Sequence, residues 1–396
     1  MKKLITLLRK VIKVLFNIPI DVPFHRPYIT YRELFAVGKV LLSGHLTMGP
    51  KTLEFESMFS AYIENKHAVA MNSCTAALHC ALRVLGIKEG DEVIVPVNTF
   101  AATAAVVKYC GATPVFVDIN RDTHCIDSGK ILEKITDKTK AIIPVHFAGH
   151  PCDMKTIMDI ARAKKLYVVE DAAHALPSWY GNKKIGTLGD ITCFSFYATK
   201  TLTTGEGGMF VTANKEWAEK AKTLRLHGII RDVWDCYSEK FRWQYDVVDL
   251  GYKYNTTDIN SALGVEQLKK VEMLWRRRVS IATKYYVKFK DVDELILYKK
   301  RLGCTSSWHL FPLKLDIEKM SFGRDEFITR LREKGVCASV HFIPLYHMKY
   351  FADNYDKYPE SEWVFNRTVS LPIYPSMSRR EVNYVIKSVL EVLDGK

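Results

Sequence analysis

The sequence predicts an α/β protein: a mostly parallel seven-stranded sheet sandwiched by helices, followed by a smaller C-terminal α+β domain. Two observations predict this fold class. Short apolar runs alternate with helical patterns from residue 51 to about 215, as they do in parallel sheets. After about residue 300, strand-like and helical segments mix instead. With 396 residues, 48% hydrophobic and 26% charged, the chain is long enough for a large core and a second domain.

Seven apolar runs are expected to be buried strands, because strands that are covered on both faces carry continuous apolar residues. These runs are His67–Met71, Glu92–Val97, Pro114–Asp118, Ala141–Val145, Leu166–Glu170, Ile191–Phe196 and Met209–Thr212. Helices are expected at Thr75–Leu85, which Gly86 ends, and at Asp153–Lys164. Ligands of such sheets bind beyond the carboxyl ends of the strands.

The rest of the chain is divided between the two domains. Residues 217–290 are expected to be mainly helical and to complete a large domain over residues 21–290. The small domain is expected over residues 291–396. Its predicted strands and helices are Ser307–Leu315, Ala338–Phe342, Arg324–Lys334 and Ser378–Leu393.

Residues 1–20 form a separate basic segment with five cations and no acid. Polar residues at steps of three and four share one helical face. Charged residues interrupt the apolar run, so we predict neither a membrane-spanning helix nor a signal peptide. Two interpretations stay open. The segment is either an amphipathic helix peripheral to the inner membrane face, or an ordinary amphipathic helix docked on the protein or on a partner subunit.

Charge and cysteine content restrict the class of protein. The formal net charge is +13, but no nucleic-acid-binding motif accompanies it. The nine cysteines are scattered and include no CxxC pair, which favours a reduced, cytoplasmic compartment over a disulfide framework. We assign no metal site. Basic residues can also attract an anionic substrate.

Two polar segments follow predicted strands. Residues 72–75 (Asn-Ser-Cys-Thr) lie between a strand and a helix, where backbone N–H groups can bind a phosphate. Serine and threonine there can also cap the helix for purely structural reasons. Asp171 ends another strand, where its carboxylate could pair with the ring nitrogen of a pyridine cofactor. The alternative interpretation of Asp171 is a helix N-cap.

A third segment carries a candidate reactive amine. Ser195 and Lys200 follow a strand and precede a loop with three glycines, Gly205, Gly207 and Gly208. Lysine in such a loop can be an ordinary surface charge. Partial desolvation would instead lower its pKa and supply the neutral amine that covalent catalysis needs. Phe100 follows another strand, where it could stack on a planar cofactor or belong to the core.

Together and in this order, these segments resemble the DegT/DnrJ/EryC1/StrS family of sugar aminotransferases over about residues 28–390. The matching strings begin at Ser43-Gly-His-Leu-Thr-Met-Gly-Pro-Lys51 and include Asn98-Thr-Phe-Ala-Ala-Thr103, Glu170-Asp-Ala-Ala-His174, Phe194-Ser-Phe-Tyr-Ala-Thr-Lys200, Thr204-Gly-Glu-Gly-Gly208, His227-Gly-Ile-Ile-Arg-Asp232, Gly251-Tyr-Lys-Tyr-Asn-Thr-Thr-Asp258 and Ser339-Val-His-Phe-Ile-Pro-Leu345. The resemblance implies fold type I of the aminotransferases that depend on pyridoxal 5'-phosphate (PLP).

The resemblance also implies roles for individual residues. Lys200 carries PLP covalently and moves the proton, and Asp171 pairs with the pyridine nitrogen. His174 lies beside the ring and Phe100 stacks on it. The phosphate is held by Cys74, Thr75 and Ser195. In the family, a residue of the Gly-Tyr-x-Tyr segment reaches the phosphate from the neighbouring subunit, which implies a homodimer. Here Lys253 and Asn255 are the two candidates for that contact.

The implied reaction takes the amino group of glutamate and transfers it to a nucleotide-linked keto-sugar. Relatives with histidine in place of the lysine perform dehydration, so Lys200 favours amine transfer. The strings around Trp308 and His341 resemble members that aminate carbon 4, and we assign Arg231 and His341 to the substrate. His341 as a core histidine is the alternative. Other hypotheses are amination of carbon 3, a non-sugar ring ketone, or a catalytically silent partner at the membrane.

Overall fold

The computed structural model describes residues 21–230, 245–352 and 357–395. The predicted helix at residues 1–20 and the predicted substrate residue Arg231 therefore lie outside the described residues. Among the described residues, no helix combines the length and the apolar character that crossing a bilayer requires.

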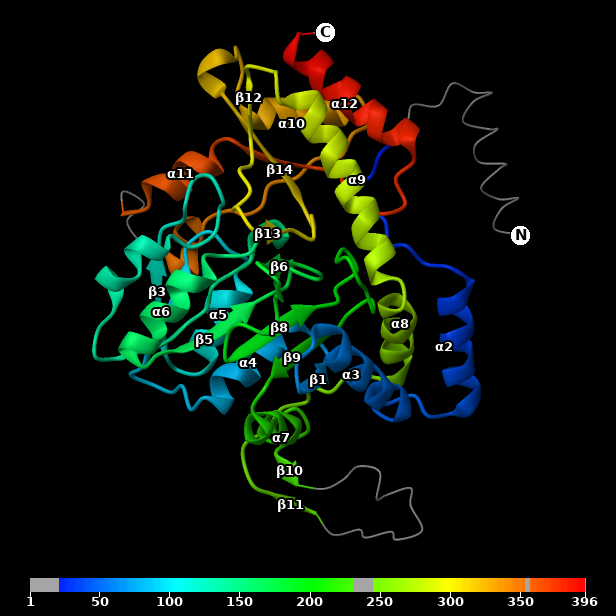
Figure 1. The fold of residues 1–396 in the computed structure, drawn as a ribbon, viewed down its shortest axis with the longest axis vertical. Coiled ribbons are helices and arrows are strands. Elements are labelled where there is room, and N and C mark those ends of the chain that lie inside the picture. Colours follow the sequence, from blue (N-terminus) through cyan, green and yellow to red (C-terminus); the bar gives the residue numbers. More distant parts are fainter. Residues whose placement is uncertain (1–20, 231–244, 353–356, 396) are drawn as a thin grey trace.

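A seven-stranded sheet forms the centre of the molecule, in the order β1-β9-β8-β5-β4-β2-β3 (Figure 1). Only β9 runs against the other six, since it pairs antiparallel with both β1 and β8. The strands are β1 (His67–Met71), β2 (Glu92–Pro96), β3 (Thr113–Val117), β4 (Thr139–Ile142), β5 (Tyr167–Asp171), β8 (Ile191–Ser195) and β9 (Gly208–Thr212). The prediction of a mostly parallel seven-stranded sheet is confirmed.

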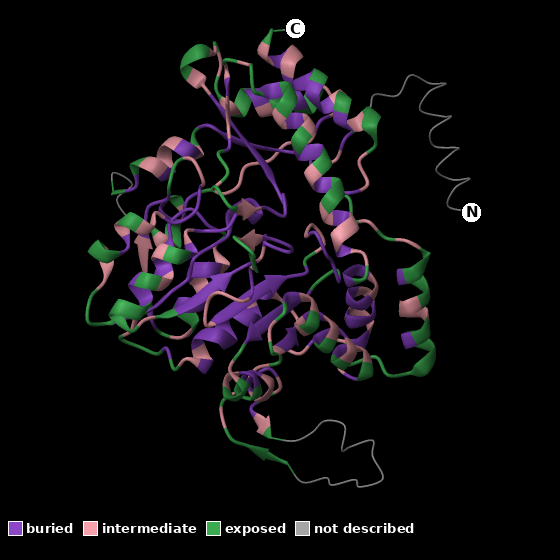
Figure 2. Cartoon of the chain, in the orientation of Figure 1, coloured by how far each residue is buried: buried purple, intermediate pink, exposed green. Residues whose placement is uncertain are grey.

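Helices cover both faces of this sheet, so its strands are mostly buried, except for the edge strand β3, which is only partly buried (Figure 2). Alternate residues of a strand point to opposite faces. Val69 and Met71 therefore pack with α4 (Cys74–Val84), α5 (Ala102–Tyr109) and α7 (Lys215–Leu224). On the other face, Ala68 and Ala70 pack with α3 (Pro50–Ile63) and α8 (Asp258–Leu268), and the strands beyond them with α6 (Met154–Lys164).

Local capping fixes where the helices begin. The Ser73 side chain accepts a hydrogen bond from Ala76 N at the start of α4. The Asp153 side chain does the same for Thr156 N at the start of α6. Reciprocal capping boxes start α2 (Tyr31–Ser43) and α12 (Arg379–Leu393).

The C-terminal part is built on a three-stranded antiparallel sheet, β12-β14-β15. The long helix α9 (Val271–Phe289) leads to it, and α10 (Arg324–Glu333) and α12 pack beside it. Its strands are β12 (Leu295–Leu297), β14 (Phe311–Leu315) and β15 (Thr368–Leu371). The remaining elements are α11 (Pro359–Phe365), the pair β10 (Ile229–Ile230) and β11 (Asp246–Val247), and the small sheet of β13 (Cys304–Thr305), β6 (Trp179–Tyr180) and β7 (Lys183–Lys184).

Two predictions in this region are wrong. Residues 338–342 are not a strand: only Ser339 pairs, exchanging backbone hydrogen bonds of 3.1 and 2.7 Å with Ser370, and the chain then turns away. The predicted strand Ser307–Leu315 begins only at Phe311, because Ser307 and His309 bond to the backbone of residues 148 and 149 instead.

The described chain begins inside the C-terminal part. Val22 N donates to Gly335 O at 2.8 Å, and Cys337 N donates to Val22 O at 3.0 Å. Val22 is also buried in the apolar cluster of the C-terminal sheet. Two residues further on, Phe24 stacks on His341, with 5.4 Å between the ring centroids. The division of the chain at residue 290 stays a prediction.

Candidate active site

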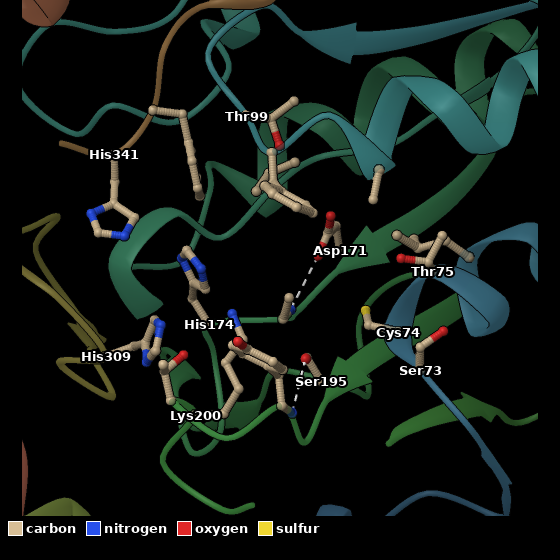
Figure 3. Close-up of a pocket in the computed structure, with 18 of the residues that line it drawn as sticks. Ser73, Cys74, Thr75, Thr99, Asp171, His174, Ser195, Lys200, His309 and His341 are labelled. Carbon is tan, nitrogen blue, oxygen red and sulfur yellow. Dashed lines mark hydrogen bonds between the residues drawn. The ribbon is translucent and has the colours of Figure 1, made fainter. Parts of the chain in front are cut away.

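A cavity of about 350 Å³ opens where β5 and β8 end and α4 begins. Eight of the residues that the sequence singles out line it: Cys74, Thr75, Phe100, Asp171, His174, Ser195, Lys200 and His341. They come from segments up to 267 positions apart (341 − 74). In Figure 3, Ser73, Cys74 and Thr75 lie on one side, His174, His309 and His341 on the other, and Asp171 between them.

The N-terminus of α4 forms one end of the cavity. The first N–H groups of a helix have no partner within the helix, and the Ser73 cap satisfies only that of Ala76. Those of Cys74 and Thr75 are free to bind an anion. Gly208 lets β9 pass beneath this turn, because a Cβ there would lie 2.4 Å from the Ser73 carbonyl carbon. This end therefore suits a phosphate.

The side chain of Cys74 does not take part in this anion site. Its thiol donates to Cys193 O at 3.6 Å, and burial raises its pKa well above the ordinary value, so it is neutral. The backbone N–H of Cys74 is the group available to a ligand. Ser195 ends β8 beside it, and its Oγ accepts only a long hydrogen bond of 3.4 Å from Tyr197 N.

Asp171 lies at the end of β5 with 5% of its surface exposed. Its Oδ1 accepts from Ala173 N at 3.1 Å and its Oδ2 from Thr103 Oγ1 at 2.9 Å. Burial raises the pKa of Asp171, and these two hydrogen bonds oppose that rise. No α-helix lies between β5 and β6, so the alternative interpretation of Asp171 as a helix N-cap is wrong.

Lys200 lies half-buried in the loop after β8. Its backbone N–H bonds to Tyr197 O at 2.9 Å, and Thr204 N closes the loop onto Phe196 O at 2.9 Å. Burial lowers the pKa of the Lys200 amine to about 8, although Cys74 and Asp171 oppose the shift. About a tenth of this amine is therefore unprotonated at pH 7, far more than of an ordinary lysine, and the unprotonated form is the nucleophile.

The wall opposite α4 is aromatic and uncharged. His174 Nδ1 accepts from Ala148 N at 3.2 Å, and its ring stacks on Phe342 at 5.8 Å between centroids. Burial lowers the pKa of His174 well below the usual range, so the ring is neutral. Phe100 borders the cavity with 63% of its surface exposed, which leaves its face open to a planar ligand.

The structure adds two residues that the sequence did not single out. Thr103 holds Asp171 through its hydroxyl, and Thr99 Oγ1 lies 2.9 Å from that hydroxyl in turn. His309 borders the cavity beside His174, with 4.3 Å between the ring centroids. Neither role is visible in the sequence, because each depends on contacts between distant segments.

Lys253 and Asn255 do not border the cavity of their own chain. The Lys253 backbone accepts from Asn72 Nδ2 at 3.2 Å, and its side chain is exposed. Asn255 Nδ2 donates to Thr256 O at 3.1 Å, whereas its Oδ1 is buried without a partner among the described residues. Their place beside Asn72 puts this segment next to the start of α4 but outside the cavity lining.

The arrangement fits PLP in three respects. The free N–H groups of α4 suit its phosphate, the buried carboxylate of Asp171 suits its pyridine nitrogen, and the amine of Lys200 suits its aldehyde. The cavity lies at the carboxyl ends of parallel strands, where α/β sheets bind ligands.

Comparisons with known proteins agree with this fit. The profile of the DegT/DnrJ/EryC1/StrS aminotransferase family matches residues 27–390. The spore coat polysaccharide biosynthesis protein SpsC of Bacillus subtilis is 43% identical over 378 residues, which cover 94% of this chain and 97% of SpsC. The PLP form of Spr1654 from Streptococcus pneumoniae superposes with a TM-score of 0.88 at 34% identity, covering 95% of this chain and 99% of that one.

A second solved structure is similar to the same extent. Helicobacter pylori PseC, an aminotransferase involved in the biosynthesis of pseudoaminic acid, has a TM-score of 0.88 at 30% identity and covers 95% of this chain and 100% of its own. The fold and the cavity thus define a PLP-dependent aminotransferase of fold type I. The chain belongs to the DegT/DnrJ/EryC1/StrS aminotransferase family. The resemblance inferred from its motifs is confirmed.

We predict that Lys200 reacts with amine reagents at unusually low pH. At pH 8 about half of an amine with a pKa of about 8 is unprotonated, against below roughly 1% for an ordinary lysine. Competitive labelling of the cofactor-free protein, measured for each lysine by mass spectrometry, should therefore give Lys200 a midpoint near pH 8. The control is Lys155, an exposed lysine whose pKa the neighbouring Asp159 raises. Parallel pH profiles for the two lysines would contradict the prediction.

We also predict that Thr103→Val weakens PLP binding about tenfold. The substitution keeps the shape of the side chain but removes a buried hydrogen bond to a carboxylate, at a cost of about 1.5 kcal/mol. The dissociation constant of PLP, measured by fluorescence titration, tests this. In the control, Thr212→Val removes the bond from Thr212 Oγ1 to Asp190 O, away from the cavity, and should leave PLP affinity unchanged. Equal affinities in the two variants would exclude the role of Thr103.

Proposed function

We propose that this aminotransferase moves the amino group of glutamate to a nucleotide-linked keto-sugar, at carbon 4 of a 4-keto-6-deoxy hexose or a 4-keto pentose. The product would enter a cell-surface glycan or a secondary metabolite. One observation carries the proposal: Lys200, Asp171 and the free N-terminus of α4 border the same cavity. The reaction is expected in the cytoplasm, as the cysteine content favours.

Each residue has one task in this proposal. Bound PLP supplies the aldehyde that takes up the amino group and the ring that stabilises negative charge on the reacting carbon. Asp171 keeps the ring nitrogen protonated. Lys200 moves the proton between the substrate carbon and the C4′ carbon of the cofactor. Thr75 and Ser195, with the N–H of Cys74, hold the phosphate, and Phe100 stacks on the ring.

Three neutral imidazoles support a sugar as the second substrate. His174, His309 and His341 share one wall of the cavity, and burial lowers the pKa of each below the usual range. Neutral imidazoles donate and accept hydrogen bonds, which matches sugar hydroxyls. SpsC is named for polysaccharide biosynthesis and PseC for the biosynthesis of pseudoaminic acid, and a sugar substrate agrees with both names.

His341 is the proposed sugar contact within this wall. Its Nδ1 lies 3.0 Å from Ser370 Oγ, its ring stacks on Phe24, and its pKa is lowered to about 4 by burial. These contacts fix the ring at the edge of the cavity. We propose that Arg231, outside the described residues, contacts the diphosphate.

We further propose that the active protein is a homodimer with shared sites. Lys253 and Asn255 lie outside the cavity of their own chain and are proposed to reach the phosphate in the partner. Large apolar side chains are exposed on α2 and around residue 250, as is typical of an interface. They are Tyr31, Leu34, Phe35, Leu41, Leu42, Tyr245, Val247, Val248 and Leu250.

The same site is compatible with amination of carbon 3 or of a non-sugar ring ketone. A catalytically silent membrane partner is the third hypothesis, and only the basic segment at residues 1–20 suggests it. The lowered pKa of the Lys200 amine argues against a protein without catalytic activity. Flotation with liposomes, with and without residues 1–20, tests the membrane contact separately.

A half-reaction tests the function. The PLP-loaded protein is mixed in turn with UDP- and dTDP-linked 4-amino-4,6-dideoxyhexoses, 4-amino-4-deoxypentoses and the corresponding 3-amino sugars. The correct amino-sugar should bleach the visible absorbance of the bound cofactor without any other reagent, because its amino group passes to PLP. Lys200→Ala should remain folded and give no steady-state turnover. Bleaching by glutamate alone, and by none of the sugars, contradicts the proposed substrate.

The shared site predicts complementation between two defective variants. Lys200→Ala lacks the amine, and the double variant Lys253→Ala/Asn255→Ala lacks the proposed contact to the partner's phosphate. A mixed dimer contains one site with every natural residue. Unfolding and refolding the two together should therefore restore about a quarter of wild-type activity, since about half of the dimers are mixed and half of their sites are intact. Activity equal to the mean of the separate variants would exclude shared sites.

A further inference from the structure

The imidazole of His309 is a buried polar group that has no polar partner among the described residues. It borders the cavity and only 6% of its surface is exposed. Its Nδ1 is fully buried and makes no hydrogen bond with any described residue. A buried nitrogen in this state costs free energy that a hydrogen bond would recover. The other ring nitrogen, Nε2, keeps accessible surface and likewise makes no hydrogen bond with a described residue, so Nε2 is the nitrogen that a ligand in the cavity can reach.

The ring is nevertheless held in place, through its backbone and by packing. His309 N donates to Ala148 O at 3.0 Å. The fully buried guanidinium of Arg278 donates from Nη1 to His309 O at 3.0 Å, to Trp308 O at 3.3 Å and to Ile373 O at 2.7 Å. The ring itself packs against His174 at an interplanar angle of 40°. Its orientation is therefore fixed before any ligand binds.

The charge state of His309 decides what it can bind. Burial lowers its pKa well below the usual range, and the nearby charges of Lys200 and Arg278 act in the same direction, as do His174 and His341. A neutral imidazole offers one donor and one acceptor. A hydroxyl can pair with Nε2 whether that nitrogen donates or accepts, whereas a carboxylate or a phosphate only accepts and favours a cationic partner.

The position of the His309 ring in the cavity indicates that its ligand is the substrate and not the phosphate of the cofactor. Figure 3 places His309 on the side of His174 and His341, beside Lys200 and across the cavity from Ser73, Cys74 and Thr75. The anion-binding end is therefore on the far side. A group that meets His309 must belong to what reacts next to Lys200.

We propose that His309 is a substrate-binding residue that contacts a hydroxyl of the sugar ring next to the reacting carbon. It acts in the sugar half-reaction and has no task in the half-reaction with glutamate, which carries no hydroxyl. The inference rests on the proposed function and assigns a residue to the sugar side of that same site.

Three variants test it. His309→Phe keeps a flat ring against His174 without polar atoms, and His309→Asn keeps a donor and an acceptor. His124→Phe is the matched control, because His124 is also buried with unpartnered ring nitrogens but lies outside the cavity. PLP affinity is measured first, followed by the single-turnover rates with glutamate and with the UDP- and dTDP-linked 4-amino-4,6-dideoxyhexoses.

His309→Phe should lower kcat/KM for the sugar half-reaction at least tenfold, with PLP affinity and the glutamate rate within about twofold of wild type. His309→Asn should recover part of the sugar rate, and His124→Phe should change neither half-reaction. An unchanged sugar rate in His309→Phe overturns the inference. An equal loss in both half-reactions, or weakened PLP binding, overturns it as well, because the residue would then support the cofactor. A wild-type protein that reacts with glutamate but with no sugar contradicts the proposed function and this inference together.

Discussion

The desolvation of one amine is the constraint on which the site depends. Lys200 must be neutral to react, and burial lowers its pKa to about 8, whereas the nearby carboxylate of Asp171 acts in the opposite direction. The pKa of Lys200 thus depends on two opposing effects, the burial that lowers it and the nearby carboxylate that raises it. The loop closed by the hydrogen bond from Thr204 N to Phe196 O keeps the amine in the cavity. The same low-dielectric surroundings keep the three neighbouring histidines uncharged.

Parallel strands bring the other groups to this amine. Because β5 and β8 run side by side in the same direction, Asp171 and Ser195 emerge at the same edge of the sheet. The reversed strand β9 brings Gly208 against the first turn of α4, where only a residue without a side chain fits. A fully buried pair, His146 and Glu170, joins the loop after β4 to strand β5, with 2.9 Å between Nε2 and Oε2. These contacts hold the residues at this edge of the sheet in fixed positions relative to one another.

Much of this was predictable from the sequence, for physical reasons. Continuous apolar runs identify strands that are buried on both faces, and all seven were found. The motifs at residues 72–75, 171–174 and 195–200 identified most of the cavity. The features that the sequence did not predict depend on contacts between segments far apart in the chain. Thr103 meets Asp171 across 68 residues, and the short strand β15 (Thr368–Leu371) exists only because β14 pairs with it. The isolated pairing of Ser339 could not be distinguished from a strand by its composition.

The two ends of the cavity come from different stretches of the chain. The anion-binding turn belongs to the N-terminal half, whereas His309 and His341 belong to loops that the C-terminal sheet supports. These loops contribute no residue to the first turn of α4, the end of the cavity that suits a phosphate. A scaffold of this kind can acquire new acceptor molecules during evolution while its chemistry is inherited unchanged.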